Sequence, residues 1–550
     1  MSISKSRKKR ARYCLLIHLQ IHYWRYGVKK SNPHVSNPAP PLRQAQCRVG
    51  CGASILGIIA VKLFCFLKSR DIYVKKWSIM KALVKTLFVI AALIINLAGF
   101  ARADLAGQIE GIISQPSQKQ VQFGIHIVKA DTGQTVYSYN AKTAMVPASN
   151  MKIIVTAAAL KYLGPNYEYK TKVGLCGDTL VVIGAGDPLL GDKVTDDKYG
   201  RKAGWIFEDI TAKLRQVGQT TIKDIIFDTT IFDNERVHPS WPKKELNRWY
   251  ASEVSGLNFN DNCIEMSVEN IGGEAVIFIE PRTNYVEIVN KIEPIQSGKS
   301  AAGAYRNQQP NKIIVKGKCK QRVGPFDVAI EQPATFFGCL LSENLSKAGI
   351  KTEGQLLEKP VNGDCNFKAL AEYTTPIADC LARCNKNSLQ LAAEALVKTI
   401  AANAMPDVKN GGWAKGQELI SRYLLELGIK EEEFHIDDGS GLSTQNKLSA
   451  NAITTVLLDV YKGENRQVYK NSLATGGIDG TIARYFKEEK YKGKIFGKTG
   501  YLGNVKSFSG LCSTANGDYI FSVLANNANG GTREVTNDIA KAIIDDEQVN

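Results

Sequence analysis

Alternating hydrophobic and polar residues predict a strand pair followed by a buried helix near the start of the folded chain. Val121–Ala130 and Thr135–Tyr139 alternate as strands do, on either side of the turn Asp131-Thr132-Gly133. Ser149–Leu163 has the apolar spacing of a helix, and Gly164-Pro165 directly after it cannot continue one.

The rest of the chain predicts a β-rich block, then helices, then strands again. Residues 171–333 are rich in short strands, for example Thr179–Ile183, Ile222–Asp228, Ala275–Ile279 and Lys312–Lys316. The helices predicted after them are Thr335–Ala348, Cys380–Ala402, Gly416–Leu427 and Ala450–Tyr461. The chain closes with the predicted strands Lys494–Gly500, Lys506–Ser513 and Asp518–Leu524 and the helix Thr532–Glu547. This order predicts an α/β domain that an insertion interrupts.

The positive charge of the protein is confined to its N-terminal part. The formal charge of the 550 residues is +17, which on its own would favour a nucleic-acid ligand. Residues 1–103 contain 19 Lys and Arg but a single acid, Asp71, whereas residues 104–550 contain 51 basic and 52 acidic residues. The body of the protein is therefore neutral, and we expect no nucleic-acid partner.

A secretory signal peptide is predicted at residues 80–103. Two lysines follow Met80, the apolar stretch Leu87–Phe100 comes next, and Ala101-Arg102-Ala103 is a small-x-small cleavage site. We expect cleavage after Ala103 and export to the periplasm, with a membrane contact only before cleavage. The alternative is an uncleaved membrane anchor, although the stretch is short for a span of about 20 residues.

Residues 1–79 show no clear helix or strand period, and a signal peptide belongs at the start of a chain. We interpret this segment as an extension from a start placed too far upstream, with translation beginning at Met80. The alternative is a genuine basic cytoplasmic tail.

Metal binding has little support in the sequence. The three histidines after residue 103, His126, His238 and His435, lie far apart, and no CxxC is present. Eight cysteines remain in this part of the chain, and the sequence does not decide between disulfides and buried free thiols.

A serine and a lysine lie three residues apart at the start of the first predicted helix. This spacing places Ser149 and Lys152 on one helix face. Serine needs a base, and a lysine serves as one only when it is neutral, a state that burial beside Ile153-Ile154-Val155 favours. Taken alone the pattern is weak, because an N-cap serine with a solvated lysine is the commoner arrangement.

Lys498-Thr499-Gly500 is the single KTG of the chain and falls on a predicted strand. This motif is able to bind a substrate carboxylate beside an edge strand through its lysine and its hydroxyl. The glycine allows a close approach to the backbone.

With Ser388 between them, these motifs follow the order of the penicillin-recognising serine acyltransferases, S-x-x-K, S-x-N and K-T-G, at spacings of 239 and 110 residues. The long first gap resembles the D-alanyl-D-alanine carboxypeptidase/endopeptidase family of penicillin-binding protein 4 type, peptidase family S13. Further segments similar to this family are 147–152 (PASNMK), 238–242 (HPSWP), 254–260 (VSGLNFN), 385–394 (NKNSLQLAAE), 438–443 (DGSGLS) and 477–481 (GIDGT).

The resemblance implies the fold and the division of the chain. It implies a β-lactamase/transpeptidase-like catalytic domain, an antiparallel sheet flanked by helices, formed by residues 104–170 together with 370–550. Residues 171–369 would form one or two inserted β-rich domains.

The resemblance also implies the chemistry. Ser149 would form an acyl-enzyme on D-Ala–D-Ala peptides of peptidoglycan, and β-lactams would acylate it as inhibitors. Lys152 would take the serine proton, and Ser388 would relay a proton to the leaving amine near Lys498. Gln390, Thr499, Gly500 and Tyr501 would bind substrate, with the N–H groups of Ser149 and Tyr501 as the oxyanion hole. No metal or organic cofactor is implied.

Gln390 stands where the family has asparagine, which adds a methylene to the second motif. A displacement of about 1 Å costs up to a hundredfold in rate. We therefore keep two alternatives: a catalytically weak penicillin- or peptidoglycan-binding protein, and a β-lactamase or esterase on the same fold. The short motifs DGSGLS and HPSWP are interpreted as scaffold rather than as catalytic groups.

Overall fold

The computed structural model describes residues 104–361, 363, 365–404 and 410–546. All of them belong to the second of the two compact units of the chain, Ala101–Asn550. The predicted extension 1–79, the signal peptide 80–103 and the final residue of the helix predicted to end at Glu547 lie outside the described residues.

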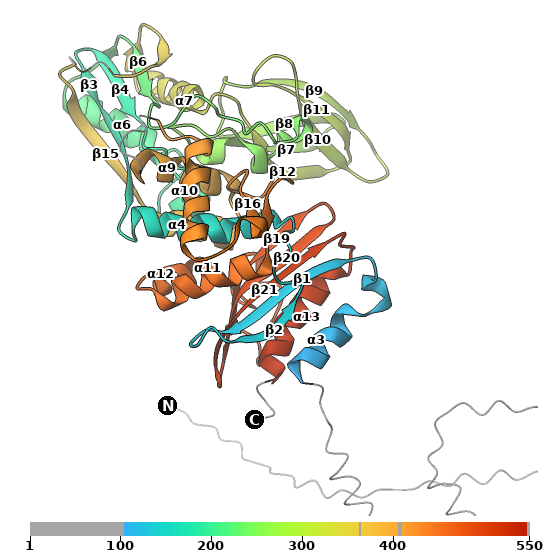
Figure 1. The fold of residues 1–550 in the computed structure, drawn as a ribbon. Coiled ribbons are helices and arrows are strands. Elements are labelled where there is room, and N and C mark those ends of the chain that lie inside the picture. Colours follow the sequence, from blue (N-terminus) through green and yellow to red (C-terminus); the bar gives the residue numbers. More distant parts are fainter. Residues whose placement is uncertain (1–103, 362, 364, 405–409, 547–550) are drawn as a thin grey trace, which may run out of the picture. The chain divides into compact units, whose positions relative to one another are not determined.

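One six-stranded sheet is built from two distant parts of the sequence (Figure 1). Its strand order is β18-β19-β20-β21-β1-β2, and every neighbouring pair is antiparallel. The strands are β1 (Gln122–Lys129), β2 (Thr135–Tyr139), β18 (Ala474–Thr475), β19 (Ile495–Leu502), β20 (Val505–Thr514) and β21 (Gly517–Asn526). Because β1 pairs with β21, the residues between β2 and β18 leave this sheet and return to it.

Helices cover both faces of the six-stranded sheet. Along β21, Phe521 and Val523 join the apolar cluster of α3 (Leu105–Ile113) and α13 (Thr532–Asp545). Ile520 and Leu524 instead join the cluster that contains α11 (Ala450–Lys462). The alternation follows from the two-residue period of a strand, which sends successive side chains to opposite faces.

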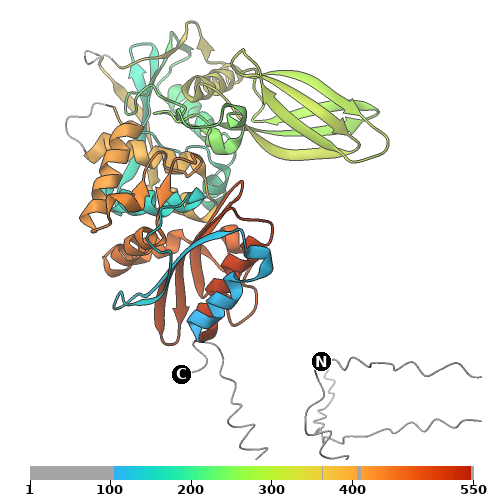
Figure 2. The ribbon, with the colours of Figure 1, turned by 45° about the vertical axis from the view of Figure 1, so that its right-hand side comes forward.

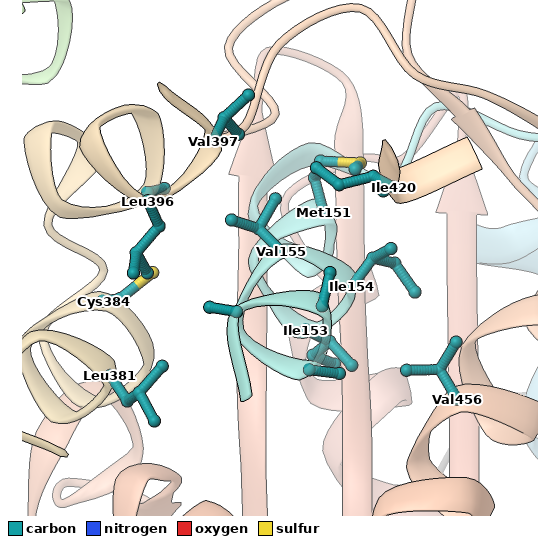
Figure 3. Packing of buried hydrophobic residues seen from close by; sticks show 14 of the residues in the cluster. Met151, Ile153, Ile154, Val155, Leu381, Cys384, Leu396, Val397, Ile420 and Val456 are labelled. Carbon is teal, nitrogen blue, oxygen red and sulfur yellow. The ribbon is translucent and has the colours of Figure 1, made fainter. Parts of the chain in front are cut away.

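The second layer is helical and is centred on α4 (Met151–Leu163). Every residue of α4 from Met151 to Leu160 is buried, as expected of a helix that is surrounded by protein. Its neighbours are α8 (Ile377–Lys386), α9 (Gln390–Ala404), α10 (Trp413–Glu426) and α11, and α12 (Arg466–Ser472) contacts it through the Tyr469 hydroxyl, which donates to the carbonyl of Ile153 at 2.9 Å. Figure 3 shows the α4 side chains packed among residues of these helices, including Cys384, Leu396 and Ile420.

The middle of the chain forms further sheets. A five-stranded sheet has the order β14-β6-β4-β3-β15, and two three-stranded sheets have the orders β12-β7-β8 and β10-β11-β9. The five strands are β3 (Glu168–Cys176), β4 (Thr179–Ile183), β6 (Ile225–Asp228), β14 (Leu356–Glu358) and β15 (Lys368–Pro376). The six strands of the smaller sheets are β7 (Cys263–Ile271), β8 (Glu274–Glu280), β9 (Glu287–Pro294), β10 (Ala301–Arg306), β11 (Lys312–Cys319) and β12 (Arg322–Ala329). Figure 2 shows the yellow-green strands of the smaller sheets extending away from the helical layer.

These middle sheets have an apolar core of their own. It also contains residues of α6 (Trp205–Gln216) and α7 (Pro333–Lys347). The remaining short elements are α5 (Lys193–Lys198), β5 (Thr221–Ile222), β13 (Lys351–Thr352), β16 (Phe434–His435), β17 (Lys447–Leu448), η1 (Pro116–Gln118), η2 (Ala148–Asn150), η3 (Lys243–Glu245), η4 (Trp249–Ala251), η5 (Asn260–Asn262), η6 (Glu431–Glu433) and η7 (Gly480–Ile482). The helices α5 and α6 lie within residues 171–333, for which the sequence predicts short strands only.

The continuous helix predicted over Cys380–Ala402 is wrong. The chain instead forms α8 and α9, with a break between Lys386 and Gln390. Ser388 in this break has φ +64°, a left-handed conformation that non-glycine residues rarely adopt. Cys380, Cys384 and Ser388 therefore do not share the face of one helix.

The cysteines are mostly free thiols in the described part of the chain. One disulfide joins Cys176, at the end of β3, to Cys365, shortly before β15. Cys263, Cys319, Cys339, Cys380, Cys384 and Cys512 are unpaired. Within the residues that the structure describes, we find no helix with the length and apolarity needed to cross a membrane.

Candidate active site

Ser149 lies where η2 passes directly into α4. The preceding residue, Ala148, has φ +46°, so the chain turns sharply just before the serine. Gly441 lies against this turn, because a Cβ on that glycine would overlap the carbonyl oxygen of Ala148. The Ser149 hydroxyl is half-buried and faces Lys152 and Ser388.

Lys152 is fully buried one turn further along, as its spacing from the serine predicted. Its Nζ lies 3.2 Å from Ser149 Oγ and 2.7 Å from the carbonyl oxygen of Ser440, and it also donates to Gln390 Oε1. Burial lowers the pKa of Lys152 to about 8, although nearby Cys384, Glu394 and Asp438 act in the opposite direction. This lysine is thus neutral over part of the ordinary pH range.

Ser388 and Lys498 complete a chain of polar groups that starts at Ser149. Ser388 Oγ donates to Ser149 Oγ at 3.3 Å, and Lys498 Nζ donates to Ser388 Oγ at 2.9 Å. Lys498 is fully buried and also donates to the carbonyl of Thr499 at 2.7 Å. Burial, with a further contribution from the charge of Lys152, holds the pKa of Lys498 well below its usual value.

Beyond Lys498, strand β19 has an open edge. On that side, β18 pairs only with Phe496 and Gly497, and the sheet assignments for the described residues give no partner to the rest of β19. A Cβ at Gly500 would overlap Ser507 Oγ and lie 3.1 Å from the Ser149 nitrogen, so the missing side chain allows β19 to approach the serine. Tyr501 follows with 68 % of its surface exposed.

Thr481 contacts the KTG motif, a contact that the sequence analysis missed. Its hydroxyl lies 3.0 Å from that of Thr499. The GIDGT segment around it is fixed by Asp479, which pairs with Lys386 at 2.6 Å and accepts from the Thr475 N–H at 2.7 Å. The motif was visible in the sequence, but its place beside Thr499 was not.

Gln390 is the first residue of α9 and is only 8 % exposed. Its Oε1 accepts from Lys152, and its Nε2 donates to the carbonyl of Tyr250 at 3.1 Å. Both ends of the carboxamide are therefore engaged, and the longer side chain is accommodated within the site.

The DGSGLS turn is built around a buried carboxylate. Asp438 accepts from the N–H groups of Gly441 and Ser443, both at 2.7 Å, and from Asn446 Nδ2 at 2.6 Å. Trp241, from the HPSWP segment, donates its indole N–H to Asp438 at 3.0 Å. The carbonyl of Ser440, which this turn presents to Lys152, is a functional group that sequence reasoning did not find.

Fold and site together define a serine acyl-transferring enzyme. The serine begins a buried helix, a depressed-pKa lysine contacts its hydroxyl, and a second serine and lysine connect it to an open strand edge. Among the described residues, no three His, Cys, Asp or Glu side chains are grouped to hold a metal ion.

Comparison with known proteins identifies the family. The model of the D-Ala-D-Ala carboxypeptidase 3 (S13) family matches residues 105–547. The chain belongs to this family of serine-type D-Ala-D-Ala carboxypeptidases, as the sequence motifs predicted.

Individual relatives agree with this assignment. A D-alanyl-D-alanine carboxypeptidase of Actinomadura sp. (strain R39) is 26% identical over 462 residues, which cover 79% of this chain and 83% of the relative. The crystal structure of penicillin binding protein 4 from Haemophilus influenzae superposes with a TM-score of 0.68 at 21% identity, covering 80% of this chain and 98% of that one. A structure of the same protein complexed with a β-lactam gives a TM-score of 0.63 at 20% identity, over 80% of this chain and 98% of that one. This likeness confirms the predicted fold class.

Proposed function

We propose that this protein is an exported D-Ala-D-Ala carboxypeptidase and DD-endopeptidase that hydrolyses peptidoglycan peptides through an acyl-enzyme on Ser149. The observation that carries the proposal is the set of contacts around Lys152 Nζ. A neutral lysine has two N–H donors and one lone pair. The carbonyl of Ser440 and the Oε1 of Gln390 can only accept, so they take both donors and leave the lone pair for the Ser149 proton.

Acylation begins when Ser149 Oγ attacks the carbonyl carbon of the D-Ala–D-Ala bond. Lys152 accepts the serine proton, and the carbonyl oxygen becomes an oxyanion. The N–H groups of Ser149 and Tyr501 would stabilise that oxyanion at the open edge of β19. The close approach of Gly500 to the Ser149 nitrogen supports this assignment.

Collapse of the intermediate breaks the peptide bond. The leaving amine needs a proton, and Ser388, whose hydroxyl lies between Ser149 and Lys498, is placed to relay to it the proton that Lys152 took, which makes Lys152 neutral again. Departure of the amine leaves the acyl group on Ser149. A water molecule then gives a proton to the neutral Lys152 and attacks the ester. Lys152 returns this proton to Ser149 Oγ as the ester bond breaks, which releases the shortened peptide and restores the serine.

Substrate recognition would use the same strand edge. An extended peptide can add to an open sheet edge through its main-chain groups. The hydroxyl groups of Thr499 and Thr481, 3.0 Å apart, together with the N–H donors of Lys498, suit a terminal carboxylate.

Penicillin is the direct probe of this proposal, since the likeness to a protein solved with a β-lactam supports β-lactam binding here. The protein from Asp104 onward is incubated with benzylpenicillin, and its intact mass is measured beside that of Ser149→Ala. We expect one adduct per wild-type molecule and none on the variant. An adduct on both proteins, or on neither while both are folded, would overturn the assignment of Ser149.

Turnover separates the proposal from its two alternatives. Release of D-Ala from a D-Ala–D-Ala peptide, and cleavage of a cross-linked dimer, is expected from the wild type. Acylation without peptide turnover would indicate a binding protein instead. Rapid loss of the adduct with release of hydrolysed penicillin, again without peptide turnover, would indicate a β-lactamase.

Export rests on the signal peptide predicted at residues 80–103. Mass spectrometry of the protein recovered from the periplasm is expected to find Asp104 as the first residue. Tryptic peptides from residues 31–70 in that material would overturn both the cleavage site and the proposed start at Met80.

A further inference from the structure

Glu394 is a buried carboxylate that lies one turn beyond Gln390 on α9 and has no surface exposed to solvent. It accepts three hydrogen bonds, from the N–H of Ser440 at 2.7 Å, the N–H of Gly439 at 2.9 Å and the indole N–H of Trp413 at 2.8 Å. Two of these three donors belong to the backbone of the DGSGLS turn. The carboxylate therefore fixes that turn to α9.

Ser440 connects this carboxylate to the proposed base. Its N–H is held by Glu394 Oε1 at 2.7 Å, and its carbonyl oxygen accepts from Lys152 Nζ at 2.7 Å. Both groups belong to one residue, so a movement of the Ser440 backbone away from Glu394 also moves the carbonyl that Lys152 contacts. The direction of the Lys152 lone pair depends on this carbonyl, because it takes one of the two N–H donors.

The same turn also supports the nucleophile. Gly441, the next residue, lies against the carbonyl of Ala148, which directly precedes Ser149. The turn that Glu394 holds is thus in contact with both partners of the proposed proton transfer. Asp438 accepts from the N–H of Gly441 at 2.7 Å, which belongs to the same peptide unit as the Ser440 carbonyl, so Asp438 and Glu394 hold the two peptide groups on either side of the Ser440 Cα.

The negative charge of Glu394 also affects the pKa of Lys152 through space. Burial, with the neighbouring Asp438, raises the pKa of Glu394 to about 7, and the three hydrogen bonds oppose that rise. Where Glu394 is ionised, its charge raises the pKa of Lys152. Loss of the charge is therefore expected to let Lys152 lose its proton at a lower pH.

We propose that Glu394 is a positioning residue for acylation: through the N–H of Ser440 it holds the Ser440 carbonyl against Lys152 Nζ. The inference rests on the proposed function of Lys152 as the base. Glu394 itself contacts neither Ser149 nor any position assigned to substrate; it acts through the turn.

The test compares Glu394→Gln with Glu394→Asp and with a control, Glu433→Gln. Glutamine at 394 would present an NH2 group to at least one of three N–H donors, which pushes the turn away. Aspartate keeps the charge but is one methylene shorter. Glu433 is also buried and accepts from Ser449 Oγ at 2.6 Å and Asn451 Nδ2 at 2.9 Å, so its variant carries the same chemical change away from the DGSGLS turn.

The measured quantity is the second-order rate of acylation by benzylpenicillin from pH 5 to pH 10, per folded molecule. We expect the acylation rate at its high-pH plateau to fall by about tenfold or more in both variants of Glu394, since displacements near 1 Å cost up to a hundredfold in rate. The pH at which the acylation rate falls to half of its plateau is expected to be lower in Glu394→Gln than in the wild type, and to be unchanged in Glu394→Asp. Glu433→Gln is expected to show the same plateau rate as the wild type, and the same pH at which that rate falls to half.

A plateau within twofold of the wild type in Glu394→Gln would overturn this inference. If Glu394→Gln does not fold, the same plateau criterion applies to Glu394→Asp. A wild type that is not acylated overturns the proposed function and this inference with it. A wild type that is acylated, with variants that behave like it, overturns this inference alone.

Discussion

Lys152 donates a hydrogen bond to the side-chain oxygen of Gln390, while the nitrogen of the same carboxamide donates to the carbonyl of Tyr250 at 3.1 Å. Gln390 therefore joins the proposed base to η4, which lies in the middle part of the sequence, about 140 residues before it. The extra methylene of glutamine, relative to the family's asparagine, provides the reach for both contacts in this backbone.

Gln390→Asn is expected to lower the acylation rate by about tenfold, although it restores the family's residue. The shorter side chain cannot keep both contacts, and a misplacement near 1 Å is costly. Stopped-flow or mass-based acylation by benzylpenicillin measures the effect. Gln445→Asn, the same change at an exposed residue bonded to Ser240, serves as the control. An acylation rate equal to or above that of the wild type would contradict this account of Gln390.

Acylation is expected to rise with pH through a midpoint near 8. Burial lowers the pKa of Lys152 to about 8. Below that pH the lysine is protonated and cannot accept the serine proton, so the rate falls as pH falls. The rate of adduct formation from pH 6 to pH 9 tests this. Lys152→Arg, whose guanidinium remains charged throughout this range, is expected to show no acylation at any pH. A rate independent of pH in the wild type would argue against Lys152 as the base.

Gly441→Ala is expected to reduce acylation by about a hundredfold. Its φ is +80°, and an added Cβ would overlap the Ala148 carbonyl beside Ser149, so the serine must move. Gly428 is a matched control, because its φ is +78° but no atom lies within 4 Å of the added carbon. Gly428→Ala should therefore show only the cost of the left-handed backbone, about 1 kcal/mol in unfolding experiments, with an unchanged acylation rate. Equal acylation rates in the two variants would refute the role of this close contact.

The sequence allowed the prediction of those parts of the site that depend on local spacing. Ser149 and Lys152 meet because three residues along a helix bring side chains to one face. The placement of Lys498 on a strand beside Gly500 was likewise predicted, because it depends on an edge strand and on the missing side chain of the glycine. Five of the six strands of the large sheet were also placed within a few residues, whereas the two-residue strand β18 was not predicted because it is too short to show an alternating pattern.

Other parts of the site depend on tertiary contacts that leave no local pattern. The helix break at Ser388 was not predicted, because the apolar spacing continues from α8 into α9 across it. The Ser440 carbonyl was missed because a main-chain acceptor has no residue-type signature. Glu394 was visible within a family-like segment, but its partners in the DGSGLS turn are 45 and 46 residues away along the chain, so only the fold reveals them.

The disulfide between Cys176 and Cys365 is expected to stabilise the protein without affecting acylation. It closes a separation of 189 residues next to the paired strands β3 and β15, and bridges over long loops contribute about 2–5 kcal/mol. Replacing both cysteines by serine should lower the midpoint of urea unfolding, and a reductant should lower that of the wild type to the same value. Cys339→Ser, at an unpaired cysteine, serves as the control and should retain the response to reductant. Because neither cysteine touches the Ser149 site, the rate of acylation by benzylpenicillin at low urea should remain that of the wild type. A wild-type midpoint that reductant leaves unchanged would show that this disulfide does not contribute to stability.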